Sequence, residues 1–395
     1  MKNIRIGLIG CGSMGINHAR SLADHKIPNA ELAAVCDTNK DNLQRIRQDI
    51  SGTAKLFENI DEMLLSGSVD AVIVATPHYF HPDLAIKAFR NDLHVLIEKP
   101  AGVFTKNVRE MNYVAEKSGK TFAIMFNQRT HPIHVKLKDI VQSGELGDIK
   151  RCNWITTQWY RPQSYYDAGV WRGTWAGEGG GILINQCPHQ LDLWQWICGR
   201  PVHVHAFCSY GKYHNIEVED DVTAYVRYAN GATGVFIAST GEAPGSNRFE
   251  IAGDNGKIVM ENDKLTFWRT RISERKFNRE YQDGFGEPES WKCEIAVKGE
   301  KEDHNGIIKN FVESILTGIP LIAPGNEGIN SLEISNAMLL SSWLGRGVDL
   351  PIDDELFYEK LQEKIQTSTF KKDTSKVRIM DNRNTYRAML LSTRQ

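Results

Sequence analysis

The stretch IRIGLIGCGSMG, residues 4–15, gives the clearest indication of the fold of the first part of the chain. Its first six residues are almost all apolar, which is typical of a strand that is buried on both faces of a sheet. Glycines follow at three positions, and a helical pattern begins near residue 16. Glycines let the backbone turn tightly and approach a pyrophosphate, while the helix N-terminus presents its N–H groups to the phosphates. The motif therefore predicts a dinucleotide site formed by Gly10, Gly12, Ser13, Met14 and Gly15.

Strand and helix patterns continue to alternate over the first third of the chain. Apolar runs at residues 32–36, 70–75, 94–97 and 121–126 are separated by segments with helical patterns. Strands that alternate with helices of this length imply βαβ units. We therefore predict an N-terminal Rossmann domain over residues 1–126, with a doubly wound parallel sheet.

The pattern changes beyond about residue 130, where long strand patterns follow one another. Asn-Gly pairs at 230–231 and 255–256 are strong hairpin signals. Consecutive hairpins predict an open, largely antiparallel sheet in a second domain over residues 127–351. One helix that begins at Pro188 interrupts this sheet, and two further helices close the domain. Residues 352–395 are charged and weakly patterned, so we expect a tail that wraps another subunit or stays loose.

Composition excludes several classes of protein. The chain has 395 residues, which favours two domains over one core. A formal net charge of −2 gives no overall attraction to nucleic acid or to an anionic membrane. No run reaches the roughly 18 apolar residues of a membrane span, and the N-terminus lacks a signal-peptide cleavage pattern. The seven cysteines include no CxxC pair, so we expect a cytoplasmic protein without a disulfide framework or a metal site.

Asp37 ends the second predicted strand, about 20 residues after the glycines, where an acid that binds the cofactor ribose is expected. A carboxylate there accepts hydrogen bonds from ribose hydroxyls and repels a 2′-phosphate. Thr38, Asn39 and Lys40 follow, and no arginine stands directly after the acid. The sequence therefore predicts NAD rather than NADP. The alternative role for Asp37 is to cap the next helix.

Two further strand ends carry polar residues. Thr76, Pro77 and His78 end one strand, and the next ends in Glu98-Lys99-Pro100. Ligands of an open α/β sheet bind outside the carboxyl ends of its strands, so we expect these residues to border the cofactor. The alternative for the charged pair is a surface ion pair of little energetic value.

Several of these motifs occur together with a later one. They are GCGSMG, Asp37, ATPHYFH, EKP and the run EGGGILINQCPHQLDLWQWICG. This combination resembles the glucose–fructose oxidoreductase / inositol dehydrogenase (Gfo/Idh/MocA) family over residues 3–350. The resemblance implies that Lys99 is the active-site lysine and His189 the acid/base histidine. It also implies that Thr76, Pro77, His78 and His81 border the nicotinamide half of NAD, with an oligomer formed through the second sheet.

Asn185 departs from many members of that family, which carry aspartate four residues before the histidine. An asparagine can orient an imidazole by a hydrogen bond but cannot stabilise an imidazolium by charge. The segment WRGTWAGEGGGILINQCPH is more similar to the branch that contains nucleotide-sugar 3-dehydrogenases, where asparagine is usual. We therefore expect Asn185 to hold the substrate or the imidazole.

His189 stands near the start of the helix that Pro188 opens, one turn before Asp192. A helix N-terminus lowers the pKa of an imidazole, which would leave His189 neutral and able to accept a proton near pH 7. The alternative is a capping or packing role. The glycine run and the EKP motif favour the catalytic interpretation.

Aromatic residues and arginines are concentrated just before this run. The cluster comprises Trp154, Trp159, Tyr160, Arg161, Tyr165, Tyr166, Trp171, Arg172 and Trp175. Such side chains suit a polyhydroxylated ring, since rings stack on its C–H faces and guanidinium groups donate to its hydroxyls. We expect Tyr160, Trp171, Arg172, Asn185 and His189 to contact the substrate. The alternative for each aromatic residue is a place in the core.

These observations predict an NAD-dependent dehydrogenase that oxidises a secondary hydroxyl of a sugar, glycoside, sugar nucleotide or related polyol, with C3 as one candidate carbon. An alternative is an NAD-dependent glycosidase that oxidises C3 transiently, eliminates the aglycone and reduces the ketone again. A non-catalytic NAD-bound sensor is disfavoured because Lys99 and His189 are both present. The long sheet has no obvious second layer of helices, so we expect a homodimer or homotetramer that buries its bare face.

Overall fold

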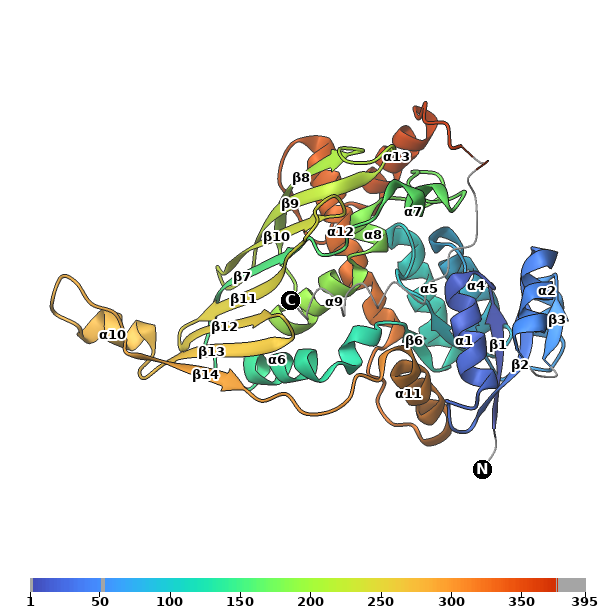
Figure 1. The fold of residues 1–395 in the computed structure, drawn as a ribbon, viewed down its shortest axis with the longest axis horizontal. Coiled ribbons are helices and arrows are strands. Elements are labelled where there is room, and N and C mark those ends of the chain that lie inside the picture. The colour runs from blue at the N-terminus through green and yellow to red at the C-terminus, as the bar shows by residue number, and fades with distance from the viewer. Residues whose placement is uncertain (1–2, 51–53, 374, 376–395) are drawn as a thin grey trace.

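The computed structural model describes residues 3–50, 54–373 and 375, and it places two sheets side by side along the long axis of the molecule (Figure 1). The N-terminal sheet has six strands in the order β3-β2-β1-β4-β5-β6, and every pair is parallel. This order is that of a doubly wound dinucleotide fold, with its topological switch between β1 and β4. The predicted Rossmann sheet is confirmed.

Helices cover both faces of this first sheet (Figure 1). The strands are β1 (Ile4–Ile9), β2 (Ala30–Cys36), β3 (Lys55–Phe57), β4 (Ala71–Val74), β5 (His94–Ile97) and β6 (Phe122–Ile124). The helices are α1 (Ser13–Ala23), α2 (Lys40–Asp49), α3 (Ile60–Leu65), α4 (His81–Arg90) and α5 (Thr105–Ser118). The short strand β3 was not predicted because its sequence, KLF, offers no apolar run of strand length.

The second sheet has nine strands in the order β14-β13-β12-β11-β7-β10-β9-β8-β15. They are β7 (Ile149–Thr156), β8 (His203–Tyr210), β9 (Glu219–Arg227), β10 (Thr233–Ser239), β11 (Asn247–Gly253), β12 (Gly256–Glu261), β13 (Lys264–Thr270), β14 (Ser290–Ile295) and β15 (Val348–Asp349). Only β7 and β10 pair in parallel, so the prediction of a largely antiparallel sheet is confirmed. Strand β7 ends at Thr156, and the N–H groups of Thr157 and Gln158 both donate to the oxygen of Ser246 at the end of the ladder.

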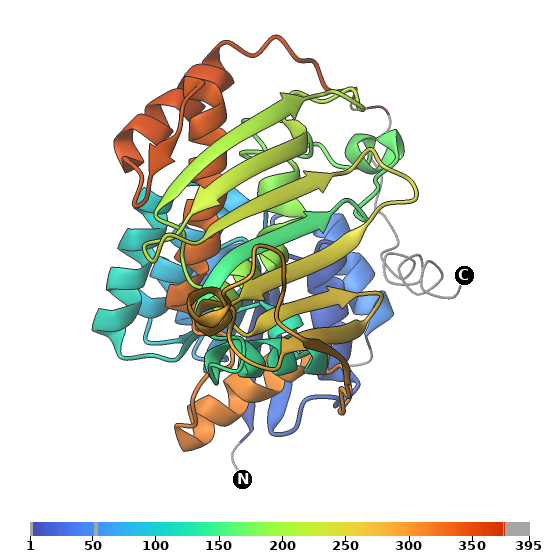
Figure 2. The ribbon, with the colours of Figure 1, turned by 90° about the vertical axis from the view of Figure 1, so that its left-hand side faces the viewer.

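One face of the second sheet packs against helices that lie between the two sheets (Figure 1). These helices are α6 (Pro132–Gln142), α8 (Ile182–Asn185), α9 (Pro188–Cys198) and α12 (Gly328–Leu344), while α7 (Gln163–Asp167) lies at the upper end of the sheet. Figure 2 looks onto the other face, where the strands are open to the viewer and the connection with α10 (Glu274–Glu280) crosses one end. Among the residues that the structure describes, no helix is long and apolar enough to cross a membrane.

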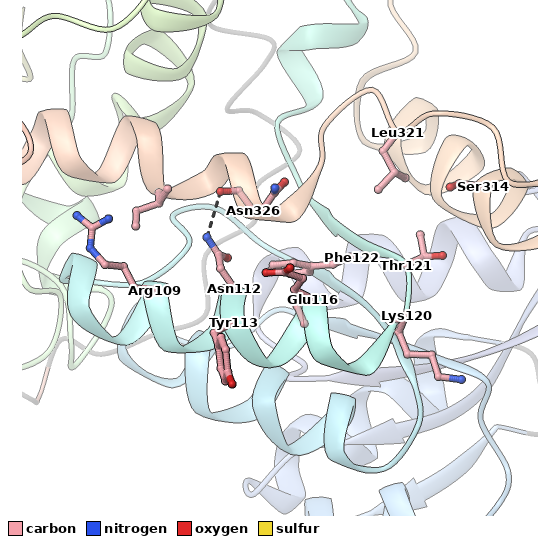
Figure 3. Close-up of a pocket in the computed structure, with 13 residues that line it drawn as sticks. Arg109, Asn112, Tyr113, Glu116, Lys120, Thr121, Phe122, Ser314, Leu321 and Asn326 are labelled. Carbon is pink, nitrogen blue, oxygen red and sulfur yellow. Dashed lines mark hydrogen bonds between the residues drawn. The ribbon is translucent and has the colours of Figure 1, made fainter.

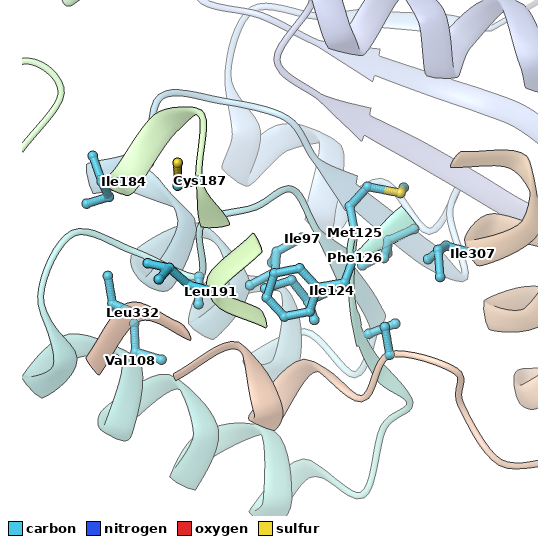
Figure 4. Close-up of a cluster of buried hydrophobic side chains, with 14 of the residues drawn as sticks. Ile97, Val108, Ile124, Met125, Phe126, Ile184, Cys187, Leu191, Ile307 and Leu332 are labelled. Atoms are coloured by element: carbon cyan, nitrogen blue, oxygen red, sulfur yellow. The ribbon is translucent and has the colours of Figure 1, made fainter. Parts of the chain in front are cut away.

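A shared apolar core joins the two sheets (Figure 4). Ile97 at the end of β5 and Ile124 in β6 are fully buried in the same cluster as Leu191 of α9 and Leu332 of α12. The chain returns to the first sheet after α11 (Asp303–Thr317), where Ile124 donates its N–H to the oxygen of Ala323. This core places the carboxyl end of β5 beside the helix that carries His189.

The segment after residue 352 was expected to be a tail, but its first part packs on its own chain. Asp353 caps α13 (Asp354–Gln366) by accepting hydrogen bonds from two N–H groups of the first turn. Asp354 accepts from Thr105 and Arg109 of α5, and the buried ring of Phe357 stacks on Trp343. The weak apolar pattern failed to predict this helix because only Phe357 and Leu361 are fully buried. Residues 374 and 376–395 of the predicted tail lie outside the described residues.

Candidate active site

The glycine turn has the geometry that a dinucleotide requires. Gly10 has φ +92°, and a Cβ atom there would lie 2.7 Å from the backbone oxygen of Ala75 in the neighbouring strand. A Cβ on Gly15 would lie 2.0 Å from the oxygen of Gly10, so that helix and strand pack only because the residue is glycine. A Cβ on Gly12 would meet no described atom within 4 Å. The open side of the turn therefore lies at Gly12, where a pyrophosphate would approach.

The first turn of α1 follows directly, with Gly12 as its N-cap and Ser13 and Met14 as its first residues. No side chain caps this helix end. The first N–H groups of α1 therefore lie at the glycine turn, which is the arrangement of phosphate-binding helix ends.

Asp37 reaches from the end of β2 to this turn. Its Oδ2 atom accepts from the N–H of Cys11 at 2.7 Å and from the side-chain amide of Asn42 at 3.1 Å, while Oδ1 accepts from the N–H of Asn39 at 2.8 Å. The side chain is half-buried, so its outer lone pairs remain open to ribose hydroxyls. Arg45 of α2, which sequence reasoning missed, donates to the oxygen of Cys11 on the same turn.

The residues after β4 differ in what they can offer a cofactor. The hydroxyl of Thr76 is buried without a hydrogen-bond partner in the described structure, and its methyl group borders Gly10. An unpartnered hydroxyl beside the glycine turn fits a bound dinucleotide. Pro77 precedes the single turn that His78 begins, and His78 Nδ1 lies 3.3 Å from the oxygen of Glu178.

His81 was predicted to border the nicotinamide, but its ring faces the protein backbone. Its Nδ1 lies 2.7 Å from the oxygen of Pro100, and its Nε2 lies 2.8 Å from the oxygen of Thr76. The residue has no exposed surface. His81 therefore joins the ends of β4 and β5 to each other and has no ring nitrogen left for a ligand.

The EKP motif places two charged groups in the interior. Glu98 Oε1 lies 2.7 Å from Nε2 of His18 in α1, and both side chains are almost fully buried. Burial alone would raise the pKa of Glu98, but the hydrogen bond and charge of His18 lower it to about 2. Glu98 thus holds α1 against β5 and lies behind the cofactor turn. Its carboxylate is not a surface ion-pair partner.

Lys99 points toward the second domain. Its Nζ atom donates to the backbone oxygen of Asn185 at 2.8 Å. Burial lowers the pKa of Lys99, Glu98 opposes this effect, and the charges of Arg172 and Arg161 lower the pKa further. A partly buried ammonium with a depressed pKa, at the carboxyl end of a central strand, is typical of a catalytic group.

Asn185 connects this lysine to an acid that sequence reasoning missed. The side-chain amide of Asn185 donates to Oε1 of Glu178, and the other oxygen of that carboxylate accepts from the N–H of Gly173 at 2.6 Å. Glu178 is fully buried, and burial raises its pKa. Its position directly before the glycine run was the available signal, since a charge there needs partners when it is buried.

The glycine run serves close packing. A Cβ on Gly179 would lie 2.2 Å from Val103, and one on Gly181 would lie 2.0 Å from the oxygen of Glu219. The Glu219 carboxylate accepts from the N–H groups of Gly181 and Leu183. The run therefore brings Asn185 and its helix close to the end of β5.

His189 is the second residue of α9, which begins at Pro188 as predicted. Its Nδ1 atom is buried and lacks a partner among the described residues, and its ring meets Phe126 edge-on. Burial lowers the pKa of His189 well below its ordinary value, and the charge of Lys99 adds to this effect. The direction is as predicted, but burial and Lys99, rather than the helix end, are its main causes.

Asp192, one turn further along α9, does not pair with His189. Its carboxylate receives two hydrogen bonds from the guanidinium of Arg129, at 2.6 and 2.8 Å, and both side chains are about 1% exposed. This buried bidentate pair fixes α9 against the segment after β6. Sequence reasoning missed it because Arg129 carries no local motif.

The aromatic cluster divides into core and site. Trp154 stacks on Phe249 within the core, with a centroid distance of 4.3 Å, and the rings of Trp159, Tyr166 and Trp175 are also buried. The Trp171 ring meets His78 edge-on at 5.2 Å. Tyr160 is 48% exposed and lies on the surface. Of the three predicted substrate residues in this cluster, Trp171 and Arg172 therefore border the site, and Tyr160 does not.

Two guanidinium groups lie over the ring of Tyr165. Their Cζ atoms are 4.3 Å (Arg172) and 5.0 Å (Arg161) from its centroid, and Arg172 also donates to the Tyr165 hydroxyl. In the described part of the chain, their hydrogen bonds go to the Tyr160 carbonyl and this hydroxyl, with no carboxylate partner. Both guanidinium charges lower the pKa of Lys99. The side of the site that Tyr165 occupies is therefore cationic.

A separate groove of about 780 Å³ lies where α5 and the start of β6 meet residues 314–329 (Figure 3). It runs between α5 and the segment around Asn326, whose oxygen accepts from Asn112. The groove contains none of the predicted site residues. In the described residues, no three histidine, cysteine or acidic side chains are arranged to hold a metal ion.

Comparison with known protein families identifies both halves of the chain. Residues 4–126 match the oxidoreductase family with an NAD-binding Rossmann fold, and residues 134–259 match the Gfo/Idh/MocA C-terminal domain. The chain belongs to the Gfo/Idh/MocA oxidoreductase family. The predicted family, cofactor and enzyme class are thereby confirmed, and NAD fits the open glycine turn and the Asp37 carboxylate described above.

Individual relatives are similar at moderate identity. Myo-inositol 2-dehydrogenase of Thermotoga maritima is 27% identical over 88% of this chain and 98% of its own length. D-glucoside 3-dehydrogenase of Escherichia coli is 29% identical over 58% of this chain and 68% of its own. The WlbA dehydrogenase of Chromobactrium violaceum, solved with NADH and UDP-GlcNAcA, has a TM-score of 0.75 and 29% identity over 89% of this chain and 97% of its own. The match to the rhizopine catabolism protein MocA of Rhizobium meliloti spans 59% of that protein.

Proposed function

We propose that this enzyme oxidises a secondary hydroxyl of a sugar nucleotide or glycoside, at C3, with NAD as the hydride acceptor. The observation that carries the proposal is that Lys99 donates to Asn185 and that its charge acts on the imidazole of His189. Bound NAD supplies the carbon that takes up the hydride. The protein must supply a base for the hydroxyl proton and donors for the oxygen that becomes a carbonyl.

His189 is the proposed base. Its imidazole is neutral at pH 7 because its pKa lies well below the ordinary value, and its Nδ1 atom has no competing partner in the described structure. A neutral ring can accept the hydroxyl proton as the hydride leaves the carbon that bears this hydroxyl. The imidazolium so formed is disfavoured by burial, which drives the proton onward to solvent after the reaction.

Lys99 is the proposed donor to the reacting oxygen. One of its three N–H groups is directed to Asn185, and the others are free to point to the substrate. An ammonium placed there stabilises the negative charge that develops on the alcohol oxygen in the transition state. Asn185 holds the lysine through its backbone oxygen and Glu178 through its side chain, so we assign it a positioning role.

The cationic side of the site favours a substrate with an anionic group. Arg161 and Arg172 have no carboxylate partner among the described residues and can donate to a sugar carboxylate or to a diphosphate. Trp171 adds an aromatic surface beside His78 for the sugar ring. The WlbA relative binds UDP-GlcNAcA, and another relative is a glucoside 3-dehydrogenase, which supports both the substrate class and C3.

The test is NAD reduction with a panel in which charge and nucleotide vary independently. A UDP-hexuronate, a UDP-hexose, a free hexuronate, an alkyl glucoside and myo-inositol would be compared by NADH absorbance. We expect the highest kcat/KM with an anionic sugar and transfer of deuterium from C3 into NADH. If myo-inositol were the best substrate, or if deuterium at C3 stayed in the product, the proposal would be wrong. Aglycone release without NADH accumulation would instead establish the glycosidase alternative.

A further inference from the structure

The segment after α13 crosses the upper end of the molecule and reaches the loop that carries the proposed substrate residues (Figures 1 and 2). We call residues 367–373 the strap and residues 157–181, between β7 and α8, the substrate loop. The strap lies outside both segments that match the family models, residues 4–126 and 134–259. Among the described residues, the strap is hydrogen-bonded to the loop directly at Lys372 and through Glu217 at Ser368.

The first point is Lys372. Its ammonium donates to the backbone oxygen of Tyr166 at 2.5 Å and to that of Arg172 at 2.6 Å. The Tyr166 oxygen belongs to the last turn of the short helix α7, where carbonyls lack partners within the helix. One side chain of the strap therefore joins the end of α7 to the stretch that contains Trp171 and Arg172.

The second point is Ser368. Its hydroxyl donates to the carboxylate of Glu217, whose other oxygen accepts from the N–H of Trp175 at 2.9 Å. Glu217 also donates its own N–H to the oxygen of Gly173. Both points of the strap thus act on residues 166–175. Lys372 binds backbone oxygens of the loop directly, whereas Ser368 acts through the carboxylate of Glu217.

The first point is also connected to the catalytic lysine by a continuous series of hydrogen bonds. The peptide between Arg172 and Gly173 accepts from Lys372 at its oxygen and donates to Glu178 at its N–H group. Glu178 accepts from Asn185, whose backbone oxygen accepts from Lys99. A shift of the Arg172–Gly173 peptide would therefore be transmitted to the groups that hold Lys99.

We infer that the strap holds the substrate loop in its binding conformation and that Lys372 is a positioning residue for the substrate side of the active site. Lys372 acts through Arg172 and Glu178 and does not touch the cofactor turn. The inference rests on the proposed function only for its kinetic consequences, because the restraint on the loop exists with or without a substrate.

The decisive experiment compares Lys372→Met with Lys371→Met, its exposed neighbour on the strap. Hydrogen exchange of loop peptides is measured on the full chain with NADH bound, and no substrate is required. We expect amides of residues 166–175 to exchange about tenfold faster in Lys372→Met, as the loss of hydrogen bonds to a charged group implies. Lys371→Met should match the wild type, and Lys372→Arg, which keeps the donors, should restore most of the protection.

The kinetic arm uses the best substrate of the panel. In Lys372→Met, KM for the sugar should rise about tenfold with a smaller change in kcat, while the Kd for NADH and the Tm stay within the range of Lys371→Met. Loop exchange and kcat/KM within about twofold of the Lys371→Met control would overturn the inference. Faster loop exchange in an enzyme that oxidises none of the sugars would uphold the strap and reject the proposed function.

Discussion

The Nζ atom of Lys99 lies 2.8 Å from the backbone oxygen of Asn185. This hydrogen bond joins the carboxyl end of β5 to α8, the helix that directly precedes α9 and its His189. This bond crosses from one sheet to the elements of the other. It places an ammonium of lowered pKa beside an imidazole of lowered pKa, and each charge disfavours the other. The two groups can therefore coexist only with the lysine charged and the histidine neutral, or with both neutral.

The pH profile distinguishes the roles of these two groups. If the Lys99 ammonium is the donor, kcat/KM should fall on the alkaline side at a pH below the ordinary lysine pKa of 10.5, because burial lowers the pKa of Lys99. His189 should stay neutral until the pH is well below 6.5, so no acid limb is expected near neutrality. Lys99→Met and His189→Ala should each lose about a hundredfold to ten-thousandfold in kcat with NADH affinity unchanged. A rate that rises through the same alkaline range would instead identify Lys99 as the base.

Asn185 and Glu178 offer a test by exchange of charge. Asn185→Asp places a second carboxylate against Glu178, so one of the two must hold a proton, and we expect activity to fall with rising pH. The double variant Asn185→Asp with Glu178→Gln restores one amide and one acid, and it should recover most of the kcat. Asn185→Ala serves as the control, with an expected loss of about tenfold from poorer positioning. Equal activity of the single Asp variant and the double variant at alkaline pH would refute the pairing.

Asp37 should determine the preference for NAD. Its carboxylate repels a 2′-phosphate, so Asp37→Ser should raise kcat/KM for NADP and lower it for NAD by about tenfold each. Removal of the carboxylate also leaves the N–H group of Cys11 without its hydrogen-bond acceptor. Asp37→Asn separates the two effects, because it keeps an acceptor oxygen and loses only the charge. Wild-type enzyme that uses NADP as well as NAD would contradict the assignment.

The open face of the second sheet should mediate assembly. Ile155, Phe207 and Tyr225 lie on that face with 37%, 67% and 42% of their surfaces exposed. Contiguous apolar surface of this kind is commonly buried by a second subunit. Light scattering should detect a dimer or tetramer at micromolar concentration, and Ile155→Arg should shift the enzyme to smaller species. Leu65→Arg, a change at a 77% exposed site of the first domain, should leave the mass unchanged.

Local patterns were sufficient to predict the parallel first sheet, apart from β3, and the strand, turn and helix that contain its glycine motif. The strand, glycine turn and helix of residues 4–23 are contiguous, and their conformations depend on neighbours within a few positions. Asp37 follows from the same unit, because the end of β2 must lie beside the end of β1 in a parallel pair. The position of Pro188 likewise predicted the start of the helix that carries His189.

Contacts between distant residues were decided only by the tertiary structure. Asp192 could face His189 on helical spacing alone, but it faces Arg129, 63 positions earlier, because a buried carboxylate requires a charged partner. His81 matches the family motif, yet its ring binds two backbone oxygens. The partnership of Glu178 with Asn185 and the return of Lys372 to the substrate loop depend on how the chain packs around the glycine run. A sequence specifies which side chains are available, while the direction of each buried side chain is set by the partner that satisfies it.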